Sequence, residues 1–369
     1  MLNLSTITHP TLLLDERKCR ANIRRMADQA RWHGMQLAPH FKTHQSALVG
    51  QWFRDEGVEA ITVTSLKMAR YFAQHGWQDI TIAFPLNVRE LPAIVALARQ
   101  IRLTVFINSV ATAQRVVEVV TDTELYFYVE VDTGYRRSGV HYGDTESVTQ
   151  ILAVAQSVAE LQFIGFYTHA GHTYDTTSAD EVVRIHQETL TRLRGLQKAF
   201  WEDYPKVHLS LGDTPACSIA EDFVGISVIR PGNFVYYDLT QQQIGASATA
   251  QIAICLACPV VSVYPERHEA VVHGGWVHLG KDSLFDDQGK PYYGRMVQLH
   301  SDGWSSPVAG TKVKKVSQEH GVVSLPPEMM SEVQVGDLLG ILPIHACTTA
   351  EMMRQLTTFD GKRIAMMEK

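Results

Sequence analysis

Residues 102–131 read RLTVFINSVATAQRVVEVVTDTELYFYVEV. The β-rich run Arg102–Ile107 is followed by a helix-like segment, Val110–Val120, and then by a second β-rich run, Leu125–Val131. A strand, a helix and another strand in this order are typical of the unit from which parallel sheets are built. This stretch therefore predicts an α/β fold.

The same alternation extends in both directions, from about residue 36 to about residue 240. Strands are predicted at Gln36–Pro39, Ala60–Thr64, Asp79–Phe84, Arg102–Ile107, Leu125–Val131, Leu161–Thr168, Val207–Leu211 and Ser227–Arg230. Helices are predicted at Glu16–Trp32, Ser65–His75, Val88–Ala98, Val110–Val120, Ser147–Ala159 and Ser178–Phe200, and the last connection, Pro215–Asp222, is short. A doubly wound sheet rarely contains so many units in series, so the pattern favours a (β/α)8 TIM-like barrel.

After about Leu239 the pattern changes to short β-rich runs separated by turn signals, with no long amphipathic helix before the end. Strands are predicted at Gln251–Tyr264, Glu269–His278, Thr311–Ser317, Gly321–Leu325 and Asp337–Pro343. We therefore expect a barrel domain over residues 1–240 and a mostly β domain over residues 241–369, with residues 1–14 able to pair with the β domain.

The composition is that of a globular protein, with 45% hydrophobic and 20% charged residues. A formal net charge of −6 argues against a nucleic-acid-binding surface. The chain begins without the basic and apolar segments of a signal peptide, and no run is long enough to span a membrane. Its five cysteines are scattered and odd in number, which argues against a disulfide framework. A cytoplasmic protein is the simplest interpretation.

The segment PHFKTH at residues 39–44 places Lys42 between two histidines at the end of the first predicted barrel strand. Burying a lysine is unfavourable unless its ammonium group is paired or loses its charge. A lysine at the end of an inward-pointing strand is therefore a salt-bridge partner or a reactive amine, and the alternative is an ordinary exposed lysine.

Two later loops are suited to an anion. The seventh strand ends in Gly212-Asp213-Thr214-Pro215 and the eighth in Arg230-Pro231-Gly232-Asn233. Phosphate commonly binds at these positions of a (β/α)8 barrel, although each loop alone could be an ordinary turn. A phosphate-bearing cofactor that also needs a lysine amine suggests pyridoxal phosphate.

Further polar residues follow the fifth and sixth strands, in EVDTGYRR at residues 130–137 and YTHAGH at residues 167–172. Near the C-terminus, His345 and Cys347 follow an apolar strand. If this segment is extended, their side chains point to the same side and can share a zinc ion. A free buried cysteine is the alternative. Cys255 and Cys258 lie in an apolar strand and are predicted to belong to the core.

These motifs together resemble those of the fold-type III pyridoxal-phosphate enzymes, in which an alanine-racemase-like barrel precedes a β domain. The resemblance is strongest to the branch of metal-dependent D-serine dehydratases and D-threonine aldolases. It covers nearly the whole chain and rests on PHxKTH at 39–44, EVDxGxxR at 130–137, YTHAGH at 167–172, GDTP at 212–215, RPGN at 230–233 and HAC at 345–347.

The resemblance implies a role for each matching position. Lys42 corresponds to the lysine that forms the Schiff base. The residues that match the phosphate cradle are Gly212, Thr214, Gly232 and Asn233. The residues expected around the cofactor ring are Arg137, Tyr167, His169 and Arg230, of which Arg230 matches the racemase arginine that faces the pyridine nitrogen. His345 and Cys347 match the metal ligands, for zinc or another divalent ion such as Mn2+.

The resemblance also implies a lyase that acts on small D-3-hydroxy amino acids, as a homodimer. Cys347 favours a dehydratase, because the aldolases carry an acidic residue at the second ligand position. His172 favours an aldolase, because it matches their histidine base near the substrate hydroxyl. Residues 260–300 contain no convincing match to the racemase catalytic tyrosine. A racemase of the alanine racemase type and a non-catalytic pyridoxal-phosphate carrier are the alternatives.

Overall fold

The computed structural model describes residues 2–368 and divides them into two compact units. The first unit runs from Arg24 to Gly232, and the second contains the chain up to Ile23 together with the chain from Asn233 onward. The sequence predicts a division at about residue 240, with residues 1–14 able to pair with the β domain. The structure divides the chain after Gly232, and its second unit includes the chain up to Ile23.

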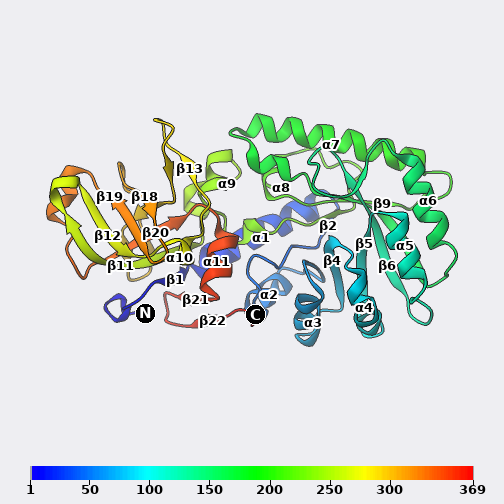
Figure 1. Cartoon of the computed structure of the whole chain (residues 1–369), viewed down its shortest axis with the longest axis horizontal. Coiled ribbons are helices and arrows are strands. Elements are labelled where there is room, and N and C mark those ends of the chain that lie inside the picture. The colour runs from blue at the N-terminus through cyan, green and yellow to red at the C-terminus, as the bar shows by residue number, and fades with distance from the viewer. Residues whose placement is uncertain (1, 369) are drawn as a thin grey trace. The chain divides into compact units, whose positions relative to one another are not determined.

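The first unit contains a parallel sheet of eight main strands that is nearly closed into a barrel (Figure 1). Around the sheet their order is β2 (Gln36–Leu37), β10 (Val228–Ile229), β9 (His208–Leu211), β8 (Leu161–Thr168), β6 (Leu125–Asp132), β5 (Arg102–Ile107), β4 (Asp79–Pro85) and β3 (Ala60–Val63). A bridge between His40 and Thr62 connects the chain after β2 to β3. The predicted (β/α)8 architecture is confirmed.

Helices surround this sheet (Figure 1). They are α2 (Ala47–Asp55), α3 (Leu66–Gln74), α4 (Leu91–Ala98), α5 (Val110–Val117), α6 (Thr145–Ala155), α7 (Ala179–Ala199) and α8 (Thr214–Ile219). Side-chain caps start several of them: Ser109 accepts from the Thr112 amide of α5, and Ser178 accepts from the Glu181 amide of α7. Helix α2 was not predicted, and its N-cap Ser46 makes no side-chain capping bond. The short strand β7 (Val140–His141), beside β6, was also not predicted.

The second unit contains a nine-stranded sheet built mainly from the C-terminal part of the chain. Its strands are β1 (Thr11–Leu14), β11 (Ile254–Tyr264), β12 (Glu269–His273), β15 (Gly294–Val297), β18 (Lys312–Val316), β19 (His320–Ser324), β20 (Leu338–Pro343), β21 (Gln355–Thr358) and β22 (Arg363–Ala365). The N-terminal strand β1 pairs antiparallel with β11. Cys255 and Cys258 are buried in β11, as predicted.

Smaller elements complete the second unit. Two short hairpins pair β13 (Leu284–Phe285) with β14 (Pro291–Tyr292) and β16 (Leu299–His300) with β17 (Gly303–Trp304). Its short helices are α9 (Leu239–Ile244), α10 (Trp276–Leu279) and α11 (Ala346–Met353), while α1 (Glu16–Trp32) begins in this unit and continues into the barrel. The predicted strand Glu269–His278 is wrong in its second half, because Gly274 and Gly275 end β12 and α10 follows. Within residues 2–368, no helix combines the length and apolar character needed to cross a bilayer.

An aromatic cluster holds the chain after β2 in place. His44 is fully buried, its ring lies 4.3 Å from the Phe41 ring and it stacks on Phe53. Its Nδ1 accepts a hydrogen bond from the Ser46 amide. Burial lowers the pKa of His44 to about 3, so the ring is neutral in the folded protein.

We expect this buried histidine to make the barrel unit less stable in acid. In the unfolded chain His44 takes up a proton near pH 6.5, whereas in the folded protein it stays neutral down to about pH 3. Unfolding therefore becomes easier as the pH falls below 6.5, by about 1.4 kcal/mol per pH unit for this one group. Urea unfolding can be measured at several pH values from 7.5 to 5. The free energy of unfolding should fall less steeply with falling pH for His44→Phe than for the wild type. If the free energy of unfolding changed equally with pH in the two proteins, His44 would not cause the loss of stability in acid.

Candidate active site

Lys42 projects from a tight turn that is anchored on both sides. Phe41 and His44 are buried, whereas the side chain of Lys42 is exposed. The Lys42 amide donates to Nδ1 of His40 at 3.4 Å, and the side-chain amide of Gln45 donates to the Lys42 carbonyl at 3.1 Å. The prediction that Lys42 ends a strand is wrong in detail, because β2 stops at Leu37 and residues 41–44 form a turn. The turn nevertheless fixes the backbone from which the Lys42 side chain projects.

The two glycine loops are packed tightly against neighbouring backbone. A Cβ atom on Gly212 would lie 2.9 Å from the carbonyl oxygen of Arg230, and one on Gly232 would lie 2.9 Å from the carbonyl oxygen of His40. Any side chain at these positions would force the loops apart. Gly232 thus joins the second loop to the turn that presents Lys42, and Gly212 joins the first loop to the second.

Thr214 offers a free hydroxyl in the first loop. Its Oγ1 is buried and has no hydrogen-bond partner in the part of the chain that the structure describes, while its amide donates to the hydroxyl of Tyr174 at 3.0 Å. Asp213 caps α8 by accepting from the Ala216 amide at 2.7 Å, and burial raises the pKa of Asp213 to about 6. A buried hydroxyl without a partner is rare in a native protein and indicates a missing ligand or water.

A polar pocket lies at the ends of β6 and β8. It is lined by Glu130, Val131, Asp132, Tyr135, Arg137, Ser138 and His169. His169 Nδ1 hydrogen-bonds with the carbonyl oxygen of Gly212, which connects this pocket to the first glycine loop. Burial, aided by the nearby charges of Arg137 and Lys42, lowers the pKa of His169 to about 3. The structure therefore places Lys42, Arg137 and Gly212 around the neutral imidazole of His169.

His172 lies beside this pocket, on the 3-10 helix Gly171–Asp175. Its ring stacks on Tyr135 with a centroid distance of 6.0 Å, and its Nδ1 is buried without a hydrogen-bond partner among residues 2–368. Burial and the nearby Arg192 lower the pKa of His172. A neutral histidine with an unpaired nitrogen can accept a proton, which is the chemistry expected of a base.

Arg230 and Tyr167 lie inside the barrel. Arg230 is buried and donates to the hydroxyls of Ser210, Thr62 and Thr81, at 2.8, 2.8 and 3.0 Å. The Tyr167 ring is also buried, 4.2 Å from Phe106, and burial raises the pKa of Tyr167. Arg230 thus connects the strands β9, β3 and β4 through hydrogen bonds. Its contact with a pyridine nitrogen stays a prediction, as does the cofactor contact of Tyr167.

His40 is a further member of this group that sequence reasoning did not single out. It is buried, and burial together with the neighbouring Lys42, His169 and Arg230 charges lowers its pKa well below the usual range. Its position two residues before Lys42 was the only available signal.

In the second unit, His345 and Cys347 lie close together at the start of α11. Their backbone is not the predicted extended segment: His345 is the N-cap of α11, and Cys347 lies in its first turn. Burial lowers the pKa of His345, but hydrogen bonds with Asp282 and Cys347 outweigh it and raise the pKa to about 11. The surroundings of the pair therefore stabilise a positive charge, which suits a metal cation.

Two carboxylates that the sequence did not reveal support this pair. Asp282 Oδ2 lies 3.4 Å from His345 Nδ1, which also lies 3.0 Å from the Thr348 hydroxyl. This arrangement leaves His345 Nε2 as the ring nitrogen that can bind a metal after losing its proton, and metal-binding histidines commonly donate their other ring N–H to a carboxylate. Asp238 is fully buried, and its Oδ2 accepts from the Ala346 amide at 2.8 Å. Asp238 thus fixes the backbone between the two side chains.

Asn233 belongs to this second unit. Its Nδ2 donates to Asp238 Oδ2 at 2.6 Å and lies 3.8 Å from Cys347 Sγ. Its Oδ1 is buried without a partner among the residues described. The side chain of Asn233 thus contacts Asp238 and Cys347, and its predicted role in the phosphate cradle stays a prediction.

The residues present fit the two expected groups. The exposed amine of Lys42, the two glycines that exclude side chains and the unpaired Thr214 hydroxyl match the requirements of pyridoxal phosphate. An imidazole and a thiol, with the second imidazole nitrogen already hydrogen-bonded, match the donor set of zinc.

Comparison with known proteins agrees with this geometry. Residues 14–240 match the family model described as the alanine racemase N-terminal domain. The chain belongs to this family. Residues 253–359 match a second model, the putative serine dehydratase domain. The combination confirms the resemblance to the fold-type III branch of D-serine dehydratases and D-threonine aldolases.

Three curated relatives span nearly the whole chain. D-threo-3-hydroxyaspartate dehydratase from Delftia sp. (strain HT23) is 27% identical, covering 94% of this chain and 92% of its own. D-serine dehydratase from Dictyostelium discoideum is 24% identical, with 95% and 93% covered. D-threonine aldolase from Arthrobacter sp. is 27% identical, with 94% and 87% covered. Both reactions considered from the sequence are therefore represented among the relatives.

A solved structure of D-threo-3-hydroxyaspartate dehydratase superimposes on the whole chain. It has a TM-score of 0.93 at 25% identity, and 100% of each chain is covered. That structure is a cysteine-to-alanine variant in the metal-free form, and a second structure of the enzyme replaces a histidine two positions earlier. The spacing of those two residues equals the spacing of His345 and Cys347 here.

Proposed function

We propose that this protein is a pyridoxal-phosphate- and zinc-dependent lyase that removes water from D-3-hydroxy amino acids. The observation that carries the proposal is the His345–Cys347 pair, which Asp282 and Asp238 hold in place. Imidazole and thiolate are zinc ligands, and two protein ligands leave positions open for a substrate hydroxyl. The relatives named as dehydratases support the same reaction.

Different residues of the chain would bind the cofactor, orient its ring and transfer the proton. When bound, pyridoxal phosphate supplies an aldehyde that links to amines and a ring that accepts electrons, and zinc supplies a Lewis acid. Lys42 would hold the cofactor and, once freed by the substrate amine, would take the proton from Cα. Thr214 and the loops at Gly212 and Gly232 would hold the phosphate. Arg137 and the neutral His169 would orient the ring.

His345 and Cys347 would hold zinc through Nε2 and Sγ. The hydroxyl on Cβ would leave as Lys42 takes the Cα proton, and hydrolysis of the product would release a keto acid and ammonia. D-Serine would give pyruvate, and D-3-hydroxyaspartate would give oxaloacetate.

Retro-aldol cleavage is the second candidate, and one observation favours it. The unpaired, buried Nδ1 of His172 can accept the proton of a substrate hydroxyl, which breaks the Cα–Cβ bond and yields glycine and an aldehyde. The same cofactor and metal residues would serve this reaction.

Product analysis tests the proposal. The protein, supplied with pyridoxal phosphate and zinc, is incubated with D-serine, D-threonine and D-3-hydroxyaspartate, and keto acid, glycine and inverted enantiomer are measured. The proposal predicts keto acid from at least one substrate. Glycine as the main product would establish the aldolase, and inverted enantiomer alone would establish a racemase.

We expect Asp282→Asn to weaken zinc binding without changing cofactor binding. The amide cannot match the negative charge of the carboxylate near His345 Nδ1, so zinc affinity should fall by about 10- to 100-fold. Competition with a chromogenic chelator measures this change. Asp287→Asn, at an exposed carboxylate in the same unit, is the control and should leave the affinity unchanged. Equal affinities for Asp282→Asn and the wild type would show that Asp282 does not orient the ligand.

A further inference from the structure

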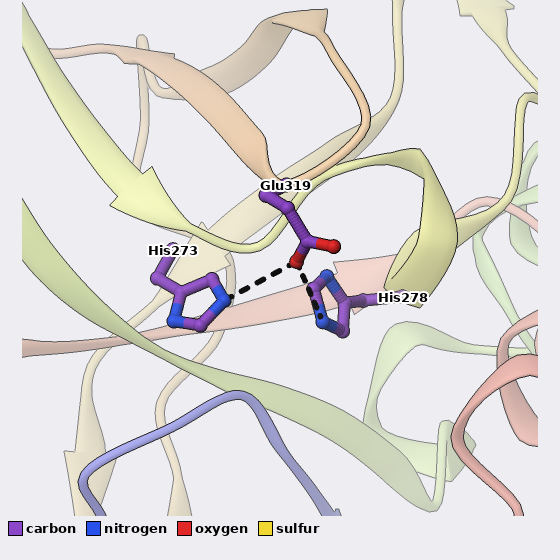
Figure 2. Close-up of side chains that lie close together, drawn as sticks. All are labelled: His273, His278 and Glu319. Atoms are coloured by element: carbon purple, nitrogen blue, oxygen red, sulfur yellow. Dashed lines mark hydrogen bonds and ion pairs between the residues drawn. The ribbon is translucent and has the colours of Figure 1, made fainter.

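Three potential metal ligands that the proposed reaction does not use lie together in the second unit. His273 ends β12, His278 lies on α10 and Glu319 lies in the turn between β18 and β19, as Figure 2 shows. One ligand atom from each residue lies within 4.8 Å of the other two. His278 is the least exposed of the three side chains, and His273 and Glu319 are open enough for an ion to enter from solvent.

The two separations that involve Glu319 are close to those of ligands that share one ion. Glu319 Oε2 lies 3.3 Å from His273 Nε2 and 3.6 Å from His278 Nε2. Two ligand atoms bound to zinc at about 2.0–2.1 Å, at the tetrahedral angle, lie about 3.3 Å apart. The 3.6 Å separation is too long for a hydrogen bond but lies close to this value.

The backbone holds the three side chains in place before any ion binds. The amides of Gly274, Trp276 and Val277 donate to the carbonyl oxygens of Glu319, Ser317 and Gln318, at 2.9, 2.9 and 3.2 Å. A Cβ atom on Gly275 would lie only 2.3 Å from the Gln318 carbonyl oxygen. The segment that carries His278 is therefore hydrogen-bonded to, and closely packed against, the turn that carries Glu319. Such preorganisation favours metal binding, because little of the chain has to be ordered.

We propose that His273, His278 and Glu319 form a second metal site, specific for a divalent transition metal such as Zn2+ and distinct from the His345–Cys347 pair. Two imidazoles and one carboxylate suit zinc and its neighbours in the first transition series better than calcium or magnesium, which prefer oxygen ligands. Three protein ligands fill part of a tetrahedral shell and leave one position for water or another ligand.

Metal binding has a defined consequence at Gly275. The Gly275 amide donates to Nδ1 of His278 at 3.2 Å, so the neutral ring carries its proton on Nε2, facing Glu319. An ion bound to Nε2 moves this proton to Nδ1, which can then no longer accept from Gly275. Occupation of the site therefore removes one hydrogen bond at the start of α10, and the Gly275 amide resonance should shift when zinc binds.

The site can be tested separately from the proposed reaction. In a His345→Ala/Cys347→Ala variant, equilibrium dialysis with Zn2+ should still detect one bound ion per chain. Adding His273→Ala or Glu319→Gln should abolish this binding, whereas adding His300→Ala, at an exposed histidine of the same unit, should preserve it. Co2+ bound to the same variant should show visible ligand-field bands without a thiolate charge-transfer band.

Two results would overturn the proposal. The first is the absence of zinc from a folded His345→Ala/Cys347→Ala variant, which would show that the cluster is only a set of hydrogen-bonded side chains. The second is zinc that stays bound when His273→Ala and Glu319→Gln are added, which would place the ion elsewhere. Neither result depends on whether the protein is a lyase.

Discussion

Replacing Lys42 by alanine is expected to abolish both the visible absorbance of the bound cofactor and the lyase activity. In the proposed reaction, Lys42 supplies both the amine that links to the cofactor aldehyde and the base that takes the Cα proton. The rate should fall by about 10³-fold or more, the scale of losing a positioned acid–base group together with covalent attachment. Absorbance spectra and keto-acid assays, both with added pyridoxal phosphate, measure the two effects.

The exposure of Lys42 makes this experiment easy to interpret. Its side chain fills no part of the core, so Lys42→Ala should keep the thermal midpoint within about 2 °C of the wild type. Lys67→Ala, at an exposed lysine on α3, is the matched control and should keep both absorbance and activity. A Lys42→Ala protein that keeps the absorbance band of a lysine-bound cofactor would refute the cofactor assignment.

The second large effect concerns Cys347. We expect Cys347→Ala to lower zinc affinity and lyase rate by about 10²-fold or more, because it removes one of only two proposed protein ligands. Cofactor absorbance should be unchanged, because Lys42, Thr214 and the glycine loops are untouched. Isothermal titration with zinc and keto-acid assays at saturating substrate separate the loss of metal from the loss of rate.

Met352→Ala is the matched control for Cys347→Ala, because Met352 lies on the same helix and is 41% exposed. It should leave zinc affinity and activity near the wild-type values. If Cys347→Ala kept its full keto-acid-forming activity in the presence of a chelator, the metal would have no part in the reaction.

The barrel could be predicted because its strands and helices carry strong local signals. The runs at Arg102–Ile107 and Leu161–Thr168 have the predicted bounds, since each is a continuous β-rich segment between polar turns. Helix α2 was missed because Gly50 and the bulky aromatic residues lower the helix propensity of this short segment, although Val49, Trp52 and Phe53 have helical spacing.

In the candidate site, too, some residues could be predicted from the sequence and others could not. Motif residues such as Lys42, His345 and Cys347 are recognisable because their neighbours in the sequence are also their neighbours in space. Asp238 and Asp282 were not found, because they lie far from His345 in the sequence and only the fold brings their carboxylates to it. The backbone of HAC was predicted wrongly because a strand that ends in Pro343 gives no local sign that a helix begins three residues later.

The most direct test of the central claim is keto-acid formation from D-serine and D-3-hydroxyaspartate before chelation, after chelation and after zinc is restored. A pyridoxal-phosphate lyase that uses His345 and Cys347 to bind zinc should form keto acid, lose this activity when the metal is removed and regain it when zinc returns. Keto-acid formation that is unaffected by complete metal removal, or none from either substrate with both cofactors supplied, would contradict the account.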